Sequence, residues 1–112
     1  MKVTYREAAQ TDLIRQFRYY LVTLGLPDIA FRFRESVRSA AGKISSYPRA
    51  AAPYMLRNRE LQTLRSWPVS GFATIRLYFL VKKDALQVIR ILHGKQNVRR
   101  ILEREKLSGN DE

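Results

Sequence analysis

The chain has 112 residues, and its 21 lysines and arginines against 10 aspartates and glutamates give a formal net charge of +11 at pH 7. A chain of this length forms one domain, so we interpret residues 1–112 as a single domain with a frayed tail at about 107–112. Hydrophobic residues make up 46% of the sequence, which excludes wholesale disorder. Cysteine is absent and His93 is the only histidine, which excludes disulfides, a thiolate nucleophile and a multi-histidine metal site.

The N-terminus has no apolar signal-peptide core, and no apolar stretch approaches the roughly 18 residues of a membrane span. We therefore expect a cytoplasmic protein. A strongly basic chain favours a polyanionic partner, which by charge alone could be nucleic acid, a membrane surface or an acidic protein.

The first predicted element is a short strand at residues 2–5, where β-branched and aromatic residues gather. A helix follows from near Arg6, because apolar residues recur at steps of three and four up to Leu24, and Gly25 is a natural stop. A second helix begins at Pro27, which suits a first helical turn, and closes near Tyr47-Pro48. The short connection between the two helices predicts an antiparallel hairpin.

Residues 48–60 read as a loop, and short β-type runs follow at residues 61–67, 72–81 and 86–93. Residues 82–85 supply a turn between the last two runs. A basic helix is predicted at residues 95–106. The sequence thus predicts an α+β fold: an N-terminal strand, an α-helical hairpin on one face of the sheet, a three-stranded antiparallel meander and a short C-terminal helix.

The second face of the meander is predicted to be open. If the turn has three residues, Arg90 lies opposite Tyr78 and Leu92 opposite Arg76. The open face would then hold three arginines around four apolar or aromatic residues: Arg65, Arg76 and Arg90 around Tyr78, Leu80, Val88 and Leu92.

The segment from Leu64 to Leu102 carries a set of short motifs along its length. These are Leu64-Arg65-Ser66, Pro68-Val69, Gly71-Phe72, Tyr78-Phe79 and the strand end from Val88 to Gly94, which contains Arg-x-Leu-His-Gly. In these residues, and in Ala8-Ala9 through Asp12-Leu13 upstream, the chain resembles the RelE/ParE toxin superfamily, specifically its ParE branch.

This resemblance implies the toxin of a type II toxin–antitoxin pair, without a cofactor. Toxins of the ParE type poison DNA gyrase, whereas those of the RelE type cut mRNA in the ribosome. Either kind is held inactive by an antitoxin, here a ParD-like one, and operator DNA is bound only through the toxin–antitoxin complex. No membrane partner is implied.

The residues favour the gyrase inhibitor over the metal-independent mRNA endonuclease. Aligned with the ribonuclease branch, Arg76 falls on the phosphate-binding arginine and Arg65 near the basic second strand. The arginine expected after the glycine falls on Gln96, and the tyrosine expected in the last helix falls on Leu102. We therefore predict no catalytic residues; the alternative endonuclease would use Arg65, Arg76 and His93, with His93 as the proton carrier.

Two sets of binding residues are predicted. The candidates for contact with the target are cations: Arg65, Arg76, Arg90, Lys95, Arg99 and Arg100. The candidates for the antitoxin are apolar or aromatic residues on the helix hairpin and the open face: Tyr19, Tyr20, Leu24, Tyr78, Leu80, Val88 and Leu92. A third hypothesis is a basic nucleic-acid-binding domain, although the cations are spread over the chain and not gathered on one recognition helix.

Overall fold

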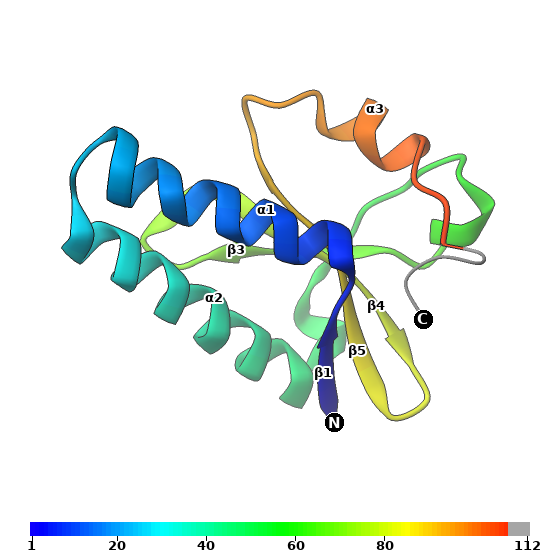
Figure 1. Cartoon of the computed structure of the whole chain (residues 1–112). Coiled ribbons are helices and arrows are strands. Elements are labelled where there is room, and N and C mark those ends of the chain that lie inside the picture. The colour runs from blue at the N-terminus through cyan, green and yellow to red at the C-terminus, as the bar shows by residue number, and fades with distance from the viewer. Residues whose placement is uncertain (108–112) are drawn as a thin grey trace.

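The computed structural model describes residues 1–107, so the predicted tail lies outside the described residues except for Leu107. Helices α1 (Glu7–Arg18) and α2 (Pro27–Ser46) run side by side as an antiparallel hairpin, as predicted (Figure 1). Between them, α1 continues as the π-helical turn η1 (Tyr19–Thr23). The chain then reverses at Gly25, whose φ of 63° is a conformation that glycine adopts without strain.

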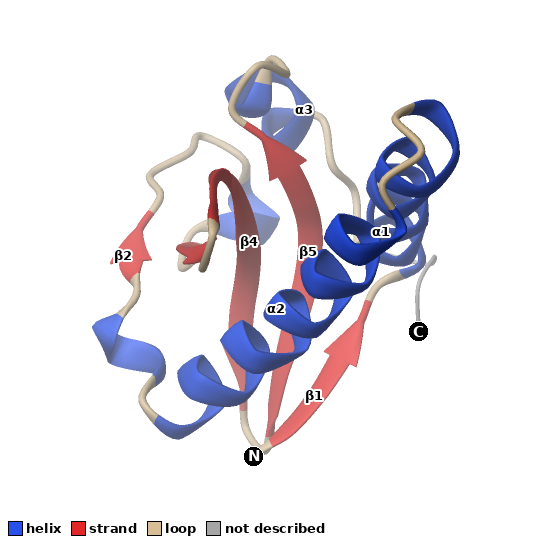
Figure 2. Cartoon of the chain, turned by 90° about the vertical axis from the view of Figure 1, so that its left-hand side faces the viewer, coloured by secondary structure: helices blue, strands red, loops and turns tan. Residues whose placement is uncertain are grey.

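The predicted meander is present as β3 (Arg65–Val69), β4 (Phe72–Lys82) and β5 (Ala85–His93). Two further strands extend it at its edges (Figure 2). Strand β1 (Lys2–Tyr5) pairs in parallel with β5, and the two-residue β2 (Ala52–Pro53) pairs with β3, so the strand order is β1-β5-β4-β3-β2.

Three short helical segments complete the fold. The 3-10 turns η2 (Pro48–Ala50) and η3 (Arg59–Leu61) lie in the predicted loop. Helix α3 (Val98–Glu103) is shorter than the predicted one and lies apart from the helix hairpin (Figure 1). In the part of the chain that the structure describes, no helix is long and apolar enough to cross a membrane.

The pairing of β4 with β5 contains a bulge. Lys82 pairs with Ala85, so the turn has two residues and not the three that the prediction assumed. The register then shifts between Tyr78 and Phe79, which restores the predicted pairs of Tyr78 with Arg90 and Arg76 with Leu92. Because a bulge turns the following side chains to the other face, Val88 lies opposite Phe79.

Both faces of the sheet are covered. The helix hairpin packs on one face over a cluster that includes Phe33, Val37, Ile44, Leu77, Phe79 and Val88. On the other face, α3 and the segment at residues 54–64 cover a second cluster, composed of Leu56, Leu61, Leu64, Tyr78, Leu80, Ile89, Leu92 and Leu102.

The predicted open face is therefore wrong. Tyr78, Leu80 and Leu92 are 3%, 5% and 1% exposed beneath α3 and the 54–64 segment, and Val88 is fully buried on the hairpin side because of the bulge. The prediction treated the final helix as a separate basic element, whereas its apolar residue Leu102 needs an apolar surface to bury against, and the sheet offers one.

Candidate functional site

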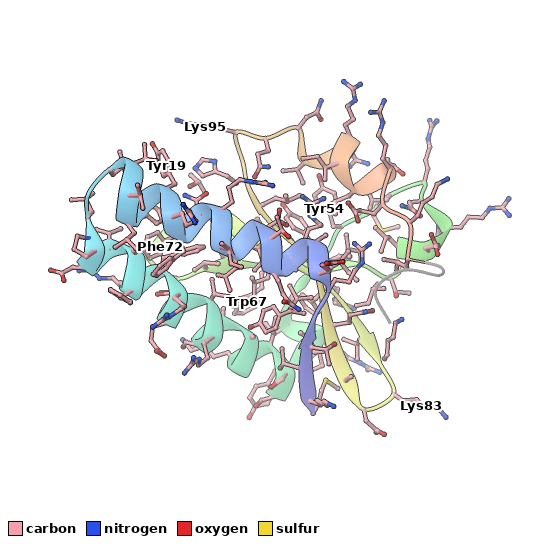
Figure 3. The ribbon with its side chains drawn as sticks, viewed as in Figure 1. Tyr19, Tyr54, Trp67, Phe72, Lys83 and Lys95 are labelled. Atoms are coloured by element: carbon pink, nitrogen blue, oxygen red, sulfur yellow. The ribbon has the colours of Figure 1, made fainter. Side chains whose placement is uncertain are left out.

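A cleft of about 420 Å³ opens between the end of α1 and the carboxyl end of β5. Its walls come from distant parts of the chain: Asp12, Arg15, Gln16, Tyr19, Tyr20, Ile91, His93, Lys95 and Gln96. Figure 3 shows Tyr19 and Lys95 at the upper left of the molecule, Tyr19 on the hairpin and Lys95 on the loop that precedes α3. The cleft brings together two predicted antitoxin contacts, one predicted target contact and the histidine of the endonuclease alternative.

The hairpin tip beside this cleft exposes large apolar side chains. The backbone N–H of Leu24 donates to the carbonyl of Tyr19 at 2.9 Å, which is the hydrogen bond of a π-helix. Such turns are rare in proteins, and those that occur are often found at functional sites. The apolar hairpin tip comprises four residues that are between 45% and 65% exposed: Tyr19, Val22, Leu24 and Leu26.

Tyr19 and Tyr20 have different surroundings although they are adjacent. The Tyr20 ring packs against Phe33 and Phe72, with centroids 5.6 Å away in both cases, and burial raises the pKa of its hydroxyl above the ordinary value. Tyr19 is 46% exposed and lies beside Tyr20 at 5.8 Å. Tyr20 therefore anchors the tip to the core, and Tyr19 presents its ring to solvent.

His93 is held by both of its ring nitrogens. The backbone N–H of Lys95 donates to Nδ1 at 3.0 Å, so Nδ1 must be the unprotonated nitrogen. Nε2 then carries the proton and lies 3.1 Å from Oγ1 of Thr74, to which it can donate. In this arrangement neither nitrogen has a lone pair free to take a proton from a substrate.

Arg65 and Arg76 do not converge. Arg65 lies opposite Phe79, which faces the helix hairpin, and its Nη1 donates to the carbonyl of Ala51 at 2.6 Å. Arg76 follows the alternation of Tyr78 on the other face, where its Nε donates to Ser66 Oγ at 3.2 Å. The prediction that both arginines share one face is therefore wrong. Arg65 shares the face of its partner Phe79, and along β4 that face is the opposite of the one that carries Arg76 and Tyr78.

Arg90 is part of an internal ion-pair network and not a free cation. Its Nε and Nη2 donate to the carboxylate of Asp12 at 2.7 and 2.8 Å, and its Nη1 donates to Glu105 at 2.6 Å. Arg6 also pairs with Glu105. The Asp12 side chain is 2% exposed and the Arg90 side chain 14%, and the hydrogen bonds to Asp12 raise the pKa of Arg90.

Asp12 also completes the sheet edge. Strand β1 ends at Tyr5, where it pairs with Val88, so the later residues of β5 have no strand beside them at this edge. The N–H of Ile91 donates instead to Oδ2 of Asp12 at 3.0 Å. A signal for this role exists in the sequence, because Asp12 falls within the apolar stripe of its helix between Ala9 and Leu13. No such signal marks Arg6 or Glu105.

The remaining predicted target contacts lie toward the C-terminus. Arg99 stacks over the ring of Tyr54 with 5.4 Å from its guanidinium carbon to the centroid, and its Nη1 donates to the carbonyl of Met55 at 2.9 Å. Lys95 and Arg100 are exposed, and within residues 1–107 neither makes an ion pair.

A helix hairpin on one face of a mixed sheet, with a short helix on the other, defines a compact basic α+β protein whose fold other proteins share. A solved structure titled "Chromosomal ParDE TA system from P. aeruginosa" superposes with a TM-score of 0.65, at 20% sequence identity, covering 83% of this chain and 95% of that chain. No curated protein sequence gives a significant match.

The family profile described as "ParE toxin of type II toxin-antitoxin system, parDE" matches residues 3–98. The match spans most of the chain, from the first strand to the start of α3. This protein belongs to the ParE toxin family.

Proposed function

We propose that this protein is a toxin that binds and inhibits DNA gyrase and that a ParD-like antitoxin neutralises it. Membership of the ParE family supports the toxin role. Two observations carry the choice of a binding inhibitor over an endonuclease: Arg65 and Arg76 lie on opposite faces of the sheet, and both ring nitrogens of His93 are engaged in hydrogen bonds.

An endonuclease of this fold needs a cation beside the scissile phosphate and a side chain able to move a proton within hydrogen-bond reach. Here Arg65 and Arg76 lie on opposite faces, and both nitrogens of His93 are engaged by Lys95 and Thr74. Arg90, the third cation predicted for this region, is occupied by Asp12 and Glu105. These contacts support inhibition by binding.

The test is a gyrase supercoiling assay with purified, folded toxin. We expect toxin to block supercoiling of relaxed plasmid and addition of the cognate antitoxin to restore it. Transcripts recovered from expressing cells should stay uncut. Normal supercoiling at saturating toxin would count against the proposal, and so would specific cleavage of ribosome-bound mRNA.

The apolar hairpin tip and the adjoining cleft suit an antitoxin segment that is amphipathic and acidic. Exposed apolar side chains at one end of a soluble domain mark a protein-binding surface, and the cations Arg15 and Lys95 at the cleft complement carboxylates. A helix lying in such a groove uses apolar anchors one turn apart. Of the seven predicted antitoxin contacts, Tyr19, Tyr20 and Leu24 remain accessible.

Substitution Leu24→Glu tests this surface, because it places a carboxylate on the apolar tip at a residue that is 45% exposed. We expect antitoxin affinity to fall by about tenfold to 100-fold, the effect of about 1.4 to 2.8 kcal/mol lost from a contact. Val81→Glu is the matched control, since Val81 is 41% exposed near the β4–β5 turn. Equal affinities of the two variants, measured by calorimetry, would place the antitoxin elsewhere.

A further inference from the structure

The second apolar cluster is covered by two segments, residues 54–64 and 95–107, which also carry much of the charge of the protein. Together they contain seven cations and three carboxylates. They are tied to each other by Asn58, whose Nδ2 donates to the carbonyls of Leu102 and Glu105 at 2.9 and 2.8 Å. The cations at residues 57–59 and 99–106 therefore belong to one end of the molecule, whereas Lys95 lies at the cleft beside Tyr19.

The three carboxylates of these segments all accept hydrogen bonds from backbone N–H groups or from the arginines of the internal network. Glu103 accepts from the backbone N–H groups of Arg57 and Asn58, both at 2.8 Å. Glu105 pairs with Arg6 and Arg90 inside the network, and its side chain is 14% exposed. Glu60 accepts from the N–H of Leu107 at 3.1 Å. The acidic groups thus leave most of the neighbouring cations unneutralised.

The side chains of the cations extend into solvent. Figure 3 shows nitrogen-tipped side chains extending into solvent around α3 and the neighbouring η3 turn. Arg99 is 61% exposed and lies 3.9 Å from Glu103, the one ion pair that a cation of these segments makes within the described residues. The other exposed cations around α3 and η3 define what we call the cationic end: Arg57, Arg59, Arg100, Arg104 and Lys106.

The composition of the cationic end fits phosphates better than a protein surface. Protein interfaces are anchored by buried aromatic and apolar residues. Among residues 54–64 and 95–107, Met55 is the one large hydrophobic side chain that is exposed, whereas the apolar tip lies on the helix hairpin. Four of the five cations are arginines, whose forked guanidinium groups bind phosphate oxygens in pairs.

We infer that the cationic end is a contact surface for the phosphate backbone of a nucleic-acid duplex, which the toxin binds without regard to sequence. This inference goes beyond the proposed function, because the contact requires neither gyrase nor antitoxin. It differs from the hypothesis of a recognition helix, since phosphate contacts position a protein on a duplex but do not read bases.

The experiment measures the affinity of the purified toxin for fluorescent duplexes of about 20 base pairs between about 50 and 200 mM salt. Each phosphate contact contributes a slope of about −0.9 to the plot of log affinity against log salt concentration. Changing Arg57, Arg59, Arg100 and Arg104 to Gln should therefore flatten the slope by about three to four. Single variants R100Q and R104Q should each flatten it by about 0.9, which keeps the test valid if the fourfold variant does not fold.

The matched control removes four exposed cations from other elements: Arg32, Lys43, Arg49 and Lys82. Its slope should change by less than about one. Equal flattening in both fourfold variants would mean that net charge alone attracts the duplex, and the inference would then be wrong. It would also be wrong if the Gln variants kept their duplex affinity and lost affinity for the antitoxin.

DNA and RNA duplexes of equal length are compared, and tighter binding of either one supports the inference and identifies the source of the phosphates.

Discussion

The Asp12–Arg90 ion pair offers a sharp test of how the fold is held together. Asp12 is 2% exposed, and its two carboxylate oxygens accept three hydrogen bonds, from Arg90 Nε, Arg90 Nη2 and the N–H of Ile91. Asp12→Asn preserves the shape of the side chain. It removes the charge and points an amide donor at one of the groups that now donate to the carboxylate.

Breaking a buried ion pair by changing one partner costs about 3–5 kcal/mol of the free energy of unfolding. We expect the lower end, about 3 kcal/mol, because Arg90 keeps its bond to Glu105 at 2.6 Å. For a domain of this size 1 kcal/mol corresponds to about 4 °C in Tm, so Asp12→Asn should lower Tm by about 12 °C.

The measurement is thermal unfolding followed by circular dichroism, with Glu35→Gln as the control. Glu35 lies 3.9 Å from Arg38, and both side chains are more than 65% exposed, so this pair should contribute no more than about 0.5 kcal/mol. A decrease in Tm below about 4 °C for Asp12→Asn, or a decrease equal to that of Glu35→Gln, would refute the assigned role of the network.

Two further predictions concern the second apolar cluster. Asn58→Ala should lower the free energy of unfolding by about 1–3 kcal/mol, because it removes the amide that donates to the carbonyls of Leu102 and Glu105, of which only Leu102 keeps a further donor within residues 1–107, the N–H of Glu105. Asn97→Ala should cost about 1 kcal/mol or less, as for a helix cap. Urea unfolding of the two variants checks this, and equal losses would contradict it. Burial raises the pKa of the Tyr78 hydroxyl above its ordinary value of 10.0. Its neutral form is therefore favoured by folding, and the resulting stability is complete below pH 10 and is lost as the pH rises through the raised pKa. Tyr78→Phe should accordingly weaken the alkaline loss of stability between about pH 10 and 12, and an unchanged pH profile in chemical unfolding would contradict this assignment.

The helical hairpin could be predicted from sequence because its determinants are local. Apolar residues recur at helical spacing on both sides of Gly25, and Pro27 suits the start of the second helix. The strands of the meander were predicted for the same reason, and the pairs of Tyr78 with Arg90 and Arg76 with Leu92 are confirmed. The family resemblance seen in the strand end from Val88 to Gly94 is confirmed by the family match.

The sequence did not indicate which residues the fold brings together at the candidate site. Tyr19, Tyr20 and Lys95 do lie together at the cleft, which no local pattern indicates, since helix and strand end are about 70 residues apart in the sequence. Arg90 was predicted as an exposed cation because an arginine on a strand gives no sign of a partner elsewhere. Its partners Asp12 and Glu105 come from the first helix and the segment after the last one.

What the sequence alone determined were the main helices and strands, their order, the class of fold and the surplus of positive charge, because these follow from the spacing of neighbouring residues and from composition. Tertiary structure decided that both faces of the sheet are covered, because α3 and residues 54–64 pack on the second face. It also decided which strand residues face each cluster, because the bulge at Tyr78 places Val88 in the cluster under the hairpin and Ile89 in the second cluster. It also decided which charges are paired. A carboxylate is neutralised by whichever cation the fold brings within hydrogen-bond distance, and that distance is set by packing between segments far apart in the chain.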